Sequence, residues 1–133
     1  MTNTPMQPMP DSMLYLPGTG RLDVAVVQNC MEACSANEQA CTMCAAHGLD
    51  CTAACMNCAD MSSTMMRTLM RMSSMTPAVM IAMLDACLAM CQLCLDECAP
   101  HADADDVCRM CAQSTQVCMD ACGALKAVIV GSK

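Results

Sequence analysis

The feature of this sequence most suggestive of chemistry is a stripe of four cysteines, Cys87, Cys91, Cys94 and Cys98, separated by steps of four, three and four residues. Residues three and four apart lie on one face of an α-helix, so all four thiols would project in one direction. Ordinary core packing does not require this alignment, whereas thiolates are preferred ligands of soft metal ions. The stripe therefore predicts one wall of a metal site, built on a single helix.

Cysteines recur at the same helical spacing through most of the chain. On a helix such pairs have Cβ atoms about 5–6 Å apart, which disfavours disulfides within a helix and leaves cross-helix ones open. Two metal–sulfur bonds of about 2.3 Å span about 4.6 Å when they are collinear, which suits a d¹⁰ monovalent ion such as Cu(I). We therefore take all fifteen cysteines as candidate metal ligands: Cys30, Cys34, Cys41, Cys44, Cys51, Cys55, Cys58, Cys87, Cys91, Cys94, Cys98, Cys108, Cys111, Cys118 and Cys122.

Charge considerations favour many ions over one. Burying fifteen thiolates in one core would be very costly unless cations neutralise them. Soft-ligand pairing predicts on the order of ten Cu(I) ions, with release of thiol protons on loading. Zinc, which prefers closed tetrahedral sites, is an alternative. Iron–sulfur clusters usually take their cysteines from loop runs, which fits these stripes poorly.

The elements that must position the thiols are four helices, expected over residues 22–46, 50–72, 77–99 and 103–130. Gly48 ends the first, Thr76 and Pro77 start the third, and Asp50 and Asp103 could cap the second and fourth. Short connections between long helices predict an all-α fold, an antiparallel up-down-up-down four-helix bundle with a cysteine-lined core at 22–133. The Met- and Pro-rich residues 1–21 read as an irregular tail, or alternatively as a thioether arm that collects copper.

Antiparallel order brings the thiols of all four helices to the end that holds the first and third turns. His47 and His101 lie in those turns and Met43 lies one helical turn before His47, so these three are candidate copper ligands at an open mouth. Asn37 and Thr115 occupy stripe positions without a soft donor, and could space copper clusters or form local hydrogen bonds. The opposite end is expected to be an apolar plug, made of Val27, Met65, Leu69, Met72, Met80, Leu84, Leu125 and Ile129.

Composition excludes several functional classes. A net charge of −7 argues against a nucleic-acid partner. The longest apolar run, 78–84, is too short to predict a membrane span. No catalytic constellation is visible, so we do not expect an enzyme, although a thiol redox or metal-detoxification protein is the alternative from another class. The N-terminus shows no secretory signal, which predicts a cytoplasmic protein unless a signal has been removed.

These stripes resemble the bacterial four-helix-bundle copper storage proteins, over residues 22–130. The resemblance implies that each of the fifteen cysteines binds Cu(I) inside the bundle and that the chain forms a homotetramer. It also implies mouth ligands similar to Met43, His47 and His101. Copper donor or acceptor proteins are further candidate partners. The Met-rich tail and plug depart from the family pattern.

Overall fold

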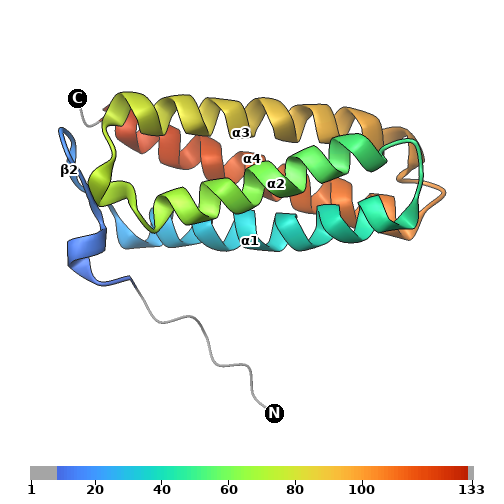
Figure 1. Ribbon diagram of the computed structural model, residues 1–133, viewed down its shortest axis with the longest axis horizontal. Helices are drawn as coiled ribbons and strands as arrows, with labels where there is room; N and C mark the ends of the chain where they lie inside the picture. Colours follow the sequence, from blue (N-terminus) through green and yellow to red (C-terminus); the bar gives the residue numbers. More distant parts are fainter. Residues whose placement is uncertain (1–8, 132–133) are drawn as a thin grey trace, which may run out of the picture.

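The computed structural model describes residues 9–131. Four helices form the body of the molecule: α1 (Val24–His47), α2 (Thr52–Leu69), α3 (Pro77–Cys98) and α4 (Asp106–Gly131). Figure 1 shows that they lie side by side, with the α1–α2 and α3–α4 connections at one end and the α2–α3 connection at the other. The predicted antiparallel bundle is confirmed. We call the first of these ends the mouth and the other the closed end.

Local sequence signals set several helix ends. The Asp23 carboxylate accepts hydrogen bonds from the backbone N–H groups of Ala25 and Val26, at 2.8 and 3.3 Å, and so caps α1. Gly48 ends α1 with φ at 82°, a left-handed conformation that glycine adopts without steric cost. Thr76 accepts a hydrogen bond from the Val79 N–H ahead of α3, as predicted.

Two predicted caps are wrong by one or two residues. The residue preceding α2 is Cys51 rather than Asp50, and its side chain makes no capping hydrogen bond. At the start of α4 the Cys108 N–H donates to Asp105 at 2.9 Å, so Asp105 rather than Asp103 holds the capping position. A 3₁₀ turn, η3 (Ala99–His101), extends the α3 end and delays the start of α4.

The segment before α1 is more ordered than the predicted irregular tail. Residues 1–8, which include Met1 and Met6, lie outside the described residues. From there the chain forms a 3₁₀ turn, η1 (Asp11–Met13), and a hairpin of β1 (Tyr15–Leu16) and β2 (Gly20–Arg21). Leu14, Leu16 and Leu22 are almost completely buried. Hydrophobic burial of three leucines holds this segment over the closed end, beside η2 (Met72–Ser74).

The closed end is packed as an apolar plug, as predicted. All eight side chains expected there have no exposed surface: Val27, Met65, Leu69, Met72, Met80, Leu84, Leu125 and Ile129. Burial of large aliphatic and thioether side chains contributes about 1.5–3 kcal/mol each to folding. The plug and the leucines of the N-terminal segment therefore seal this end of the bundle.

The helix α3, together with the turn η3 that follows it, is more apolar than the short apolar run 78–84 indicated. Among the described residues, only Pro77–His101 is long and apolar enough to cross a membrane by length and composition, with a mean hydropathy of 2.1 over an 18-residue stretch of it. It passes this test because cysteine, alanine and methionine all count as apolar. Its inward face lines the bundle core, but Val79 and Leu93 on the outside are almost half exposed. The helix thus has an apolar outer face as well as a thiol inner face.

Candidate metal centre

All fifteen cysteines are buried and none forms a disulfide. Their exposed fractions are 1% or less, so every thiol that the sequence placed on a stripe points into the bundle. Cysteine is often buried as a small hydrophobic residue. Here, however, the thiols converge from all four helices, and this requires an explanation beyond packing.

The closest sulfur contacts run between helices and not along them. The sulfur–sulfur hydrogen bonds are 3.3–3.9 Å long and each joins thiols from different helices or from a helix and a turn. The shortest joins Cys55 of α2 to Cys98 of α3 at 3.3 Å. Sequence spacing therefore identified the thiols correctly but suggested intrahelical pairs, whereas the folded chain pairs them across the core.

These hydrogen bonds divide the thiols into four groups, which we name by position. The inner cluster, nearest the plug, is Cys30, Cys34, Cys87, Cys118 and Cys122. The bridging pair is Cys58 and Cys91, at 3.8 Å. The outer cluster is Cys41, Cys55, Cys94, Cys98 and Cys111. The mouth triad is Cys44, Cys51 and Cys108.

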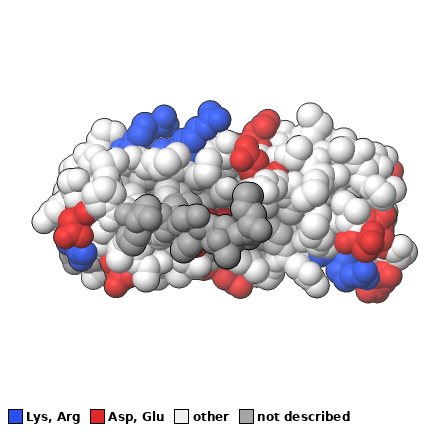
Figure 2. Space-filling view, turned by 90° about the horizontal axis from the view of Figure 1, so that it is seen from below, with Lys and Arg blue, Asp and Glu red and all other residues white. Residues whose placement is uncertain are grey.

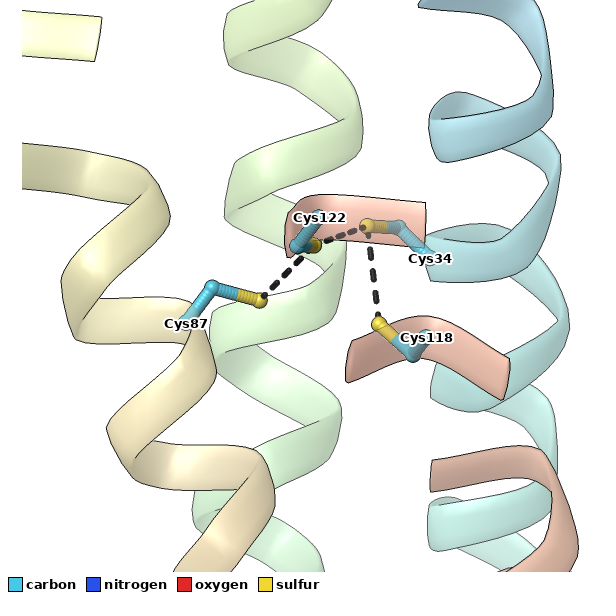
Figure 3. Close-up of side chains that lie close together, drawn as sticks. All are labelled: Cys34, Cys87, Cys118 and Cys122. Carbon is cyan, nitrogen blue, oxygen red and sulfur yellow. Dashed lines mark hydrogen bonds between the residues drawn. The ribbon is translucent and has the colours of Figure 1, made fainter. Parts of the chain in front are cut away.

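Several sets of thiols are close enough to share one ion. Four sulfurs of the inner cluster, those of Cys34, Cys87, Cys118 and Cys122, lie within 4.8 Å of one another, and Figure 3 shows them turned toward a common centre from three helices. The same limit holds for three further sets, namely Cys44–Cys55–Cys98–Cys111, Cys41–Cys58–Cys94 and Cys44–Cys51–Cys108. With metal–sulfur bonds of about 2.3 Å, sulfurs are about 4.6 Å apart in linear and about 4.0 Å apart in trigonal coordination. Small side-chain rotations would convert these sets into metal sites.

A polar layer crosses the sulfur core at mid-bundle. It consists of Asn37, Ser62 and Thr115, from α1, α2 and α4, and each has no exposed surface. The Asn37 amide nitrogen donates to the Ser62 hydroxyl at 3.1 Å, and the Thr115 hydroxyl donates to the Asn37 carbonyl oxygen at 3.1 Å. The expectation of local hydrogen bonds for Asn37 and Thr115 holds, but the sequence did not show that the two residues meet, or that Ser62 joins them.

One acidic and one basic side chain meet at the mouth. His47 Nε2 lies 2.7 Å from an Asp105 carboxylate oxygen, which links the end of α1 to the start of α4. His101 is partly buried in η3, at the same end of the bundle. Met43 instead points outward: it is 52% exposed and lines a surface hollow with Glu38, Gln39 and Thr42. The structure thus links His47, through Asp105, to the residues of the mouth, whereas Met43 lies on the outer surface.

The electrostatics of the mouth triad favour neutral thiols in the absence of metal. No Lys, Arg, His, Asp or Glu is buried among the described residues, so thiolates have no counter-charge within the bundle. Burial raises the pKa of the Cys44 thiol, and it raises that of Cys108 to about 11. Metal ions that bind here must therefore displace protons, and they bring the positive charge that the core lacks.

Acidic residues surround the mouth. Asp105 accepts the Cys108 N–H, and this hydrogen bond together with His47 lowers the pKa of its carboxyl group. Asp50, Asp103 and Asp106 lie in or beside the same two turns. Figure 2 shows acidic side chains grouped at this end of the visible face, with a basic one among them; further acidic side chains lie along the face and at the closed end, and the larger basic group lies toward the closed end. Cations approaching the bundle are attracted to the end where the thiols lie.

Comparison with known proteins identifies the family. The family of copper storage proteins, Csp, matches residues 21–127. No curated protein gives a significant match. Among solved structures, the copper storage protein Ccsp of Streptomyces lividans loaded with ten copper equivalents is 33% identical, with a TM-score of 0.76, covering 84% of this chain and 89% of that chain.

Two further structures from the same organism are similar. A cytosolic copper storage protein from Streptomyces lividans with five coppers is 34% identical, with a TM-score of 0.74, covering 77% of this chain and 93% of that chain. A single-histidine-to-alanine Ccsp variant is 33% identical, with a TM-score of 0.77 and coverages of 81% and 98%. Together with the buried thiol sets, these matches show that the chain belongs to the copper storage protein family, and that its function is to store several copper ions per molecule.

Proposed function

We propose that all fifteen cysteines are ligands and that the stored ion is Cu(I). The observation that carries this proposal is the set of cross-helix sulfur contacts in a core where, among residues 9–131, no charged side chain is buried. Soft thiolates select Cu(I), and bridging thiolates bring the ratio near one copper per sulfur, which leaves the core close to neutral. The chain then holds on the order of ten ions or more.

Copper enters and leaves through the mouth. The closed end is sealed by the plug and by Leu14, Leu16 and Leu22. At the mouth, Asp105 pairs with His47 and also accepts the backbone N–H of Cys108, a member of the mouth triad. Breaking that exposed pair would free the His47 imidazole to receive an ion and pass it to Cys44 or Cys108. His101 is a second ligand at this end, and Met43 supplies a thioether on the outer surface.

The chain acts as a cytoplasmic homo-oligomer without catalytic activity. The apolar outer face of α3, with Val79 and Leu93 each almost half exposed, supports assembly into the tetramer that the family resemblance implies. One similar protein is described as cytosolic, which supports the cytoplasmic location. Copper donor and acceptor proteins would meet the acidic mouth. Fifteen buried thiols do not suit a redox enzyme, which presents one exposed reactive pair.

An anaerobic titration with Cu(I) tests the proposal. Copper bound per chain is measured in the presence of a competing Cu(I) chelator, and free thiols are counted at each step. We expect binding on the order of ten ions and loss of nearly all reactive thiols. Saturation at one or two ions would show that most of these cysteines are structural.

Zinc is the competing cargo, because two sets of four thiols have the number of ligands that tetrahedral zinc requires. The same protein is loaded with zinc and then challenged with Cu(I). Storage of Cu(I) predicts that copper displaces all zinc and exceeds it in number, since four thiols hold one zinc but several bridging Cu(I) ions. Retention of zinc under excess Cu(I) would reverse the assignment.

A further inference from the structure

The polar layer interrupts the sulfur lining on three of the four helices at one level. Asn37, Ser62 and Thr115 all occupy core positions where their helices otherwise carry thiols or apolar side chains. On α3 the stripe continues without a break through Cys87, Cys91, Cys94 and Cys98. The sulfur lining is therefore continuous along one wall only.

Asn37 connects this layer to the bridging pair. Its amide nitrogen lies 3.4 Å from the Cys58 sulfur and 3.9 Å from the Cys91 sulfur, and donates to both. Its carbonyl oxygen accepts hydrogen bonds from Thr115 and, at 3.5 Å, from the Cys41 thiol of the outer cluster. One amide thus holds thiols from three helices in position.

The inner cluster lies between the plug and the polar layer. Beyond Cys30, Cys87 and Cys122 lie the fully buried side chains of the plug, including Leu84 and Leu125. Between the inner and outer clusters lie the polar layer and the bridging pair. Amide and hydroxyl groups are hard donors and bind Cu(I) weakly compared with thiolates. An ion that moves between the clusters must therefore be carried by Cys58 and Cys91.

We propose that the Asn37–Ser62–Thr115 layer divides the copper store into an inner and an outer compartment, and that copper passes between them only through the Cys58–Cys91 pair. The inference rests on the proposed function, since it concerns the path of stored Cu(I). Asn37 is the centre of the layer, because it contacts Ser62, Thr115 and both thiols of the pair.

The transfer step is a ligand exchange without redox change. An ion held by Cys41, Cys58 and Cys94, whose sulfurs lie within 4.8 Å of one another, forms a new bond to Cys91. The bond to Cys94 breaks, and the proton of the Cys91 thiol moves to the Cys94 thiolate. Copper remains Cu(I), and the charge of the core is unchanged. A second exchange then delivers the ion to the inner cluster.

A purely structural role for the layer is the competing explanation. A buried asparagine can fix the register of packed helices at some cost in stability. Such a role predicts altered stability on mutation but no selective change in copper movement. The test must therefore separate the inner from the outer ions while measuring capacity and folding independently.

The experiment follows removal of copper from the fully loaded full-length chain by excess high-affinity Cu(I) chelator without oxygen. The wild type is expected to lose copper in two phases, a fast one from the mouth triad and outer cluster and a slow one from the inner cluster. Crystals stripped through the fast phase only should retain copper at Cys34, Cys87, Cys118 and Cys122. A single phase at full capacity, or retained copper spread evenly through the core, would overturn the two compartments.

Two variants test the passage itself. Cys91→Ser removes the bridging sulfur and should lower the rate constant of the slow phase about tenfold or more. Tenfold is equivalent to about 1.4 kcal/mol in the barrier. The rate constant of the fast phase should be unchanged. Asn37→Cys adds a thiol within the layer and should accelerate the slow phase by a similar factor. Equal effects of Cys91→Ser on both phases, or no acceleration in Asn37→Cys, would contradict the assigned path.

Matched controls guard against indirect effects. Ser63→Ala and Ser114→Ala change hydroxyl residues adjacent to Ser62 and Thr115 that are not buried in the core, and both should leave the two phases unaltered. Thr115→Val removes one hydroxyl of the layer at almost constant volume, and it replaces Asn37→Cys as the test variant if Asn37→Cys fails to fold. In Thr115→Val only the rate of the slow phase should change. Low total copper in the wild type would refute the storage proposal instead, so the two failures are distinguishable.

Discussion

The two halves of this bundle use the same helices and the same helical spacing for different purposes. At the closed end the inward positions hold large apolar side chains such as Leu84 and Leu125, whereas toward the mouth they hold thiols. Each buried methylene contributes about 0.8 kcal/mol, so the plug supplies far more packing free energy per position than the sulfur half. The spacing of residues determines where a side chain points, and the residue type determines whether packing or metal binding stabilises that region.

The largest expected effect is stabilisation of the sulfur half by copper. Free ligand at a thousand times the dissociation constant of one site stabilises the folded state by about 4 kcal/mol, and this core has many sites. Hydrogen exchange should therefore slow strongly on loading at the amides around Cys94 and Cys111. Amides around Leu84 and Leu125 should change much less. Equal protection at both ends would show that the halves are not energetically distinct.

Truncation in the plug should have the next largest effect. Leu84→Ala leaves a cavity among fully buried side chains and should lower the free energy of unfolding of the apo protein by about 2–5 kcal/mol, measured by denaturant titration. Copper capacity should stay unchanged, because the plug provides no thiol. Val117→Ala, at a 57%-exposed position on α4, is the control and should cost about 0.5 kcal/mol or less. Loss of copper in Leu84→Ala would show that the plug also shapes the metal core.

The pH dependence of stability should have opposite signs in the apo and loaded proteins. Unfolded thiols ionise near pH 8.5, but burial raises the pKa of Cys108 to about 11, so the unfolded state binds fewer protons in this interval. Apo stability should therefore fall as the pH rises from about 8.5 to 11. The loaded protein has already lost these protons, and it should instead lose copper as the pH falls. Thermal unfolding of the apo protein across this pH range measures the first trend, and thermal unfolding of the loaded protein at pH values below it measures the second.

The smallest effect concerns the mouth. Asp105→Ala removes the carboxylate that caps α4 and pairs with His47, and should slightly lower the stability of the apo protein. Since its pKa is lowered, Asp105 stabilises the fold above its unfolded pKa of about 3.9, and this contribution is lost as the pH falls through its folded value. Asp103→Ala, two residues earlier, should cause little change. An equal loss of stability in both variants would show that the effect comes from net surface charge and not from the cap or the pair with His47.

Much of the fold could be predicted because the helical stripes are long and regular. The steps of three and four residues around Cys91 or Cys118 leave one inward face per helix, and short connections leave one antiparallel order. These two facts placed every cysteine in the core and the plug at the opposite end. Partners across the core could not be predicted, since the contact of Cys55 with Cys98 depends on how the helices are shifted along one another.

Shorter features carried too little signal. The strands of the N-terminal hairpin have two residues each, and the prolines before it favour an irregular reading. Its order comes from tertiary burial of Leu14 and Leu16, which no local pattern reveals. The polar layer had a partial signal, because Asn37 and Thr115 visibly interrupt thiol stripes. Ser62 could be joined to them only by the registers of three separate helices.

The hairpin also gives the molecule a useful optical property. Tyr15, on β1, is the only aromatic residue in the chain, and its ring is about half exposed at the end away from the thiols. Tyrosine fluorescence therefore reports the closed end alone, without background from tryptophan. Ultraviolet absorption by copper–thiolate bonds reports the other end. Each half of the protein thus has its own spectroscopic signal, and unfolding of one can be followed while the other is loaded or emptied.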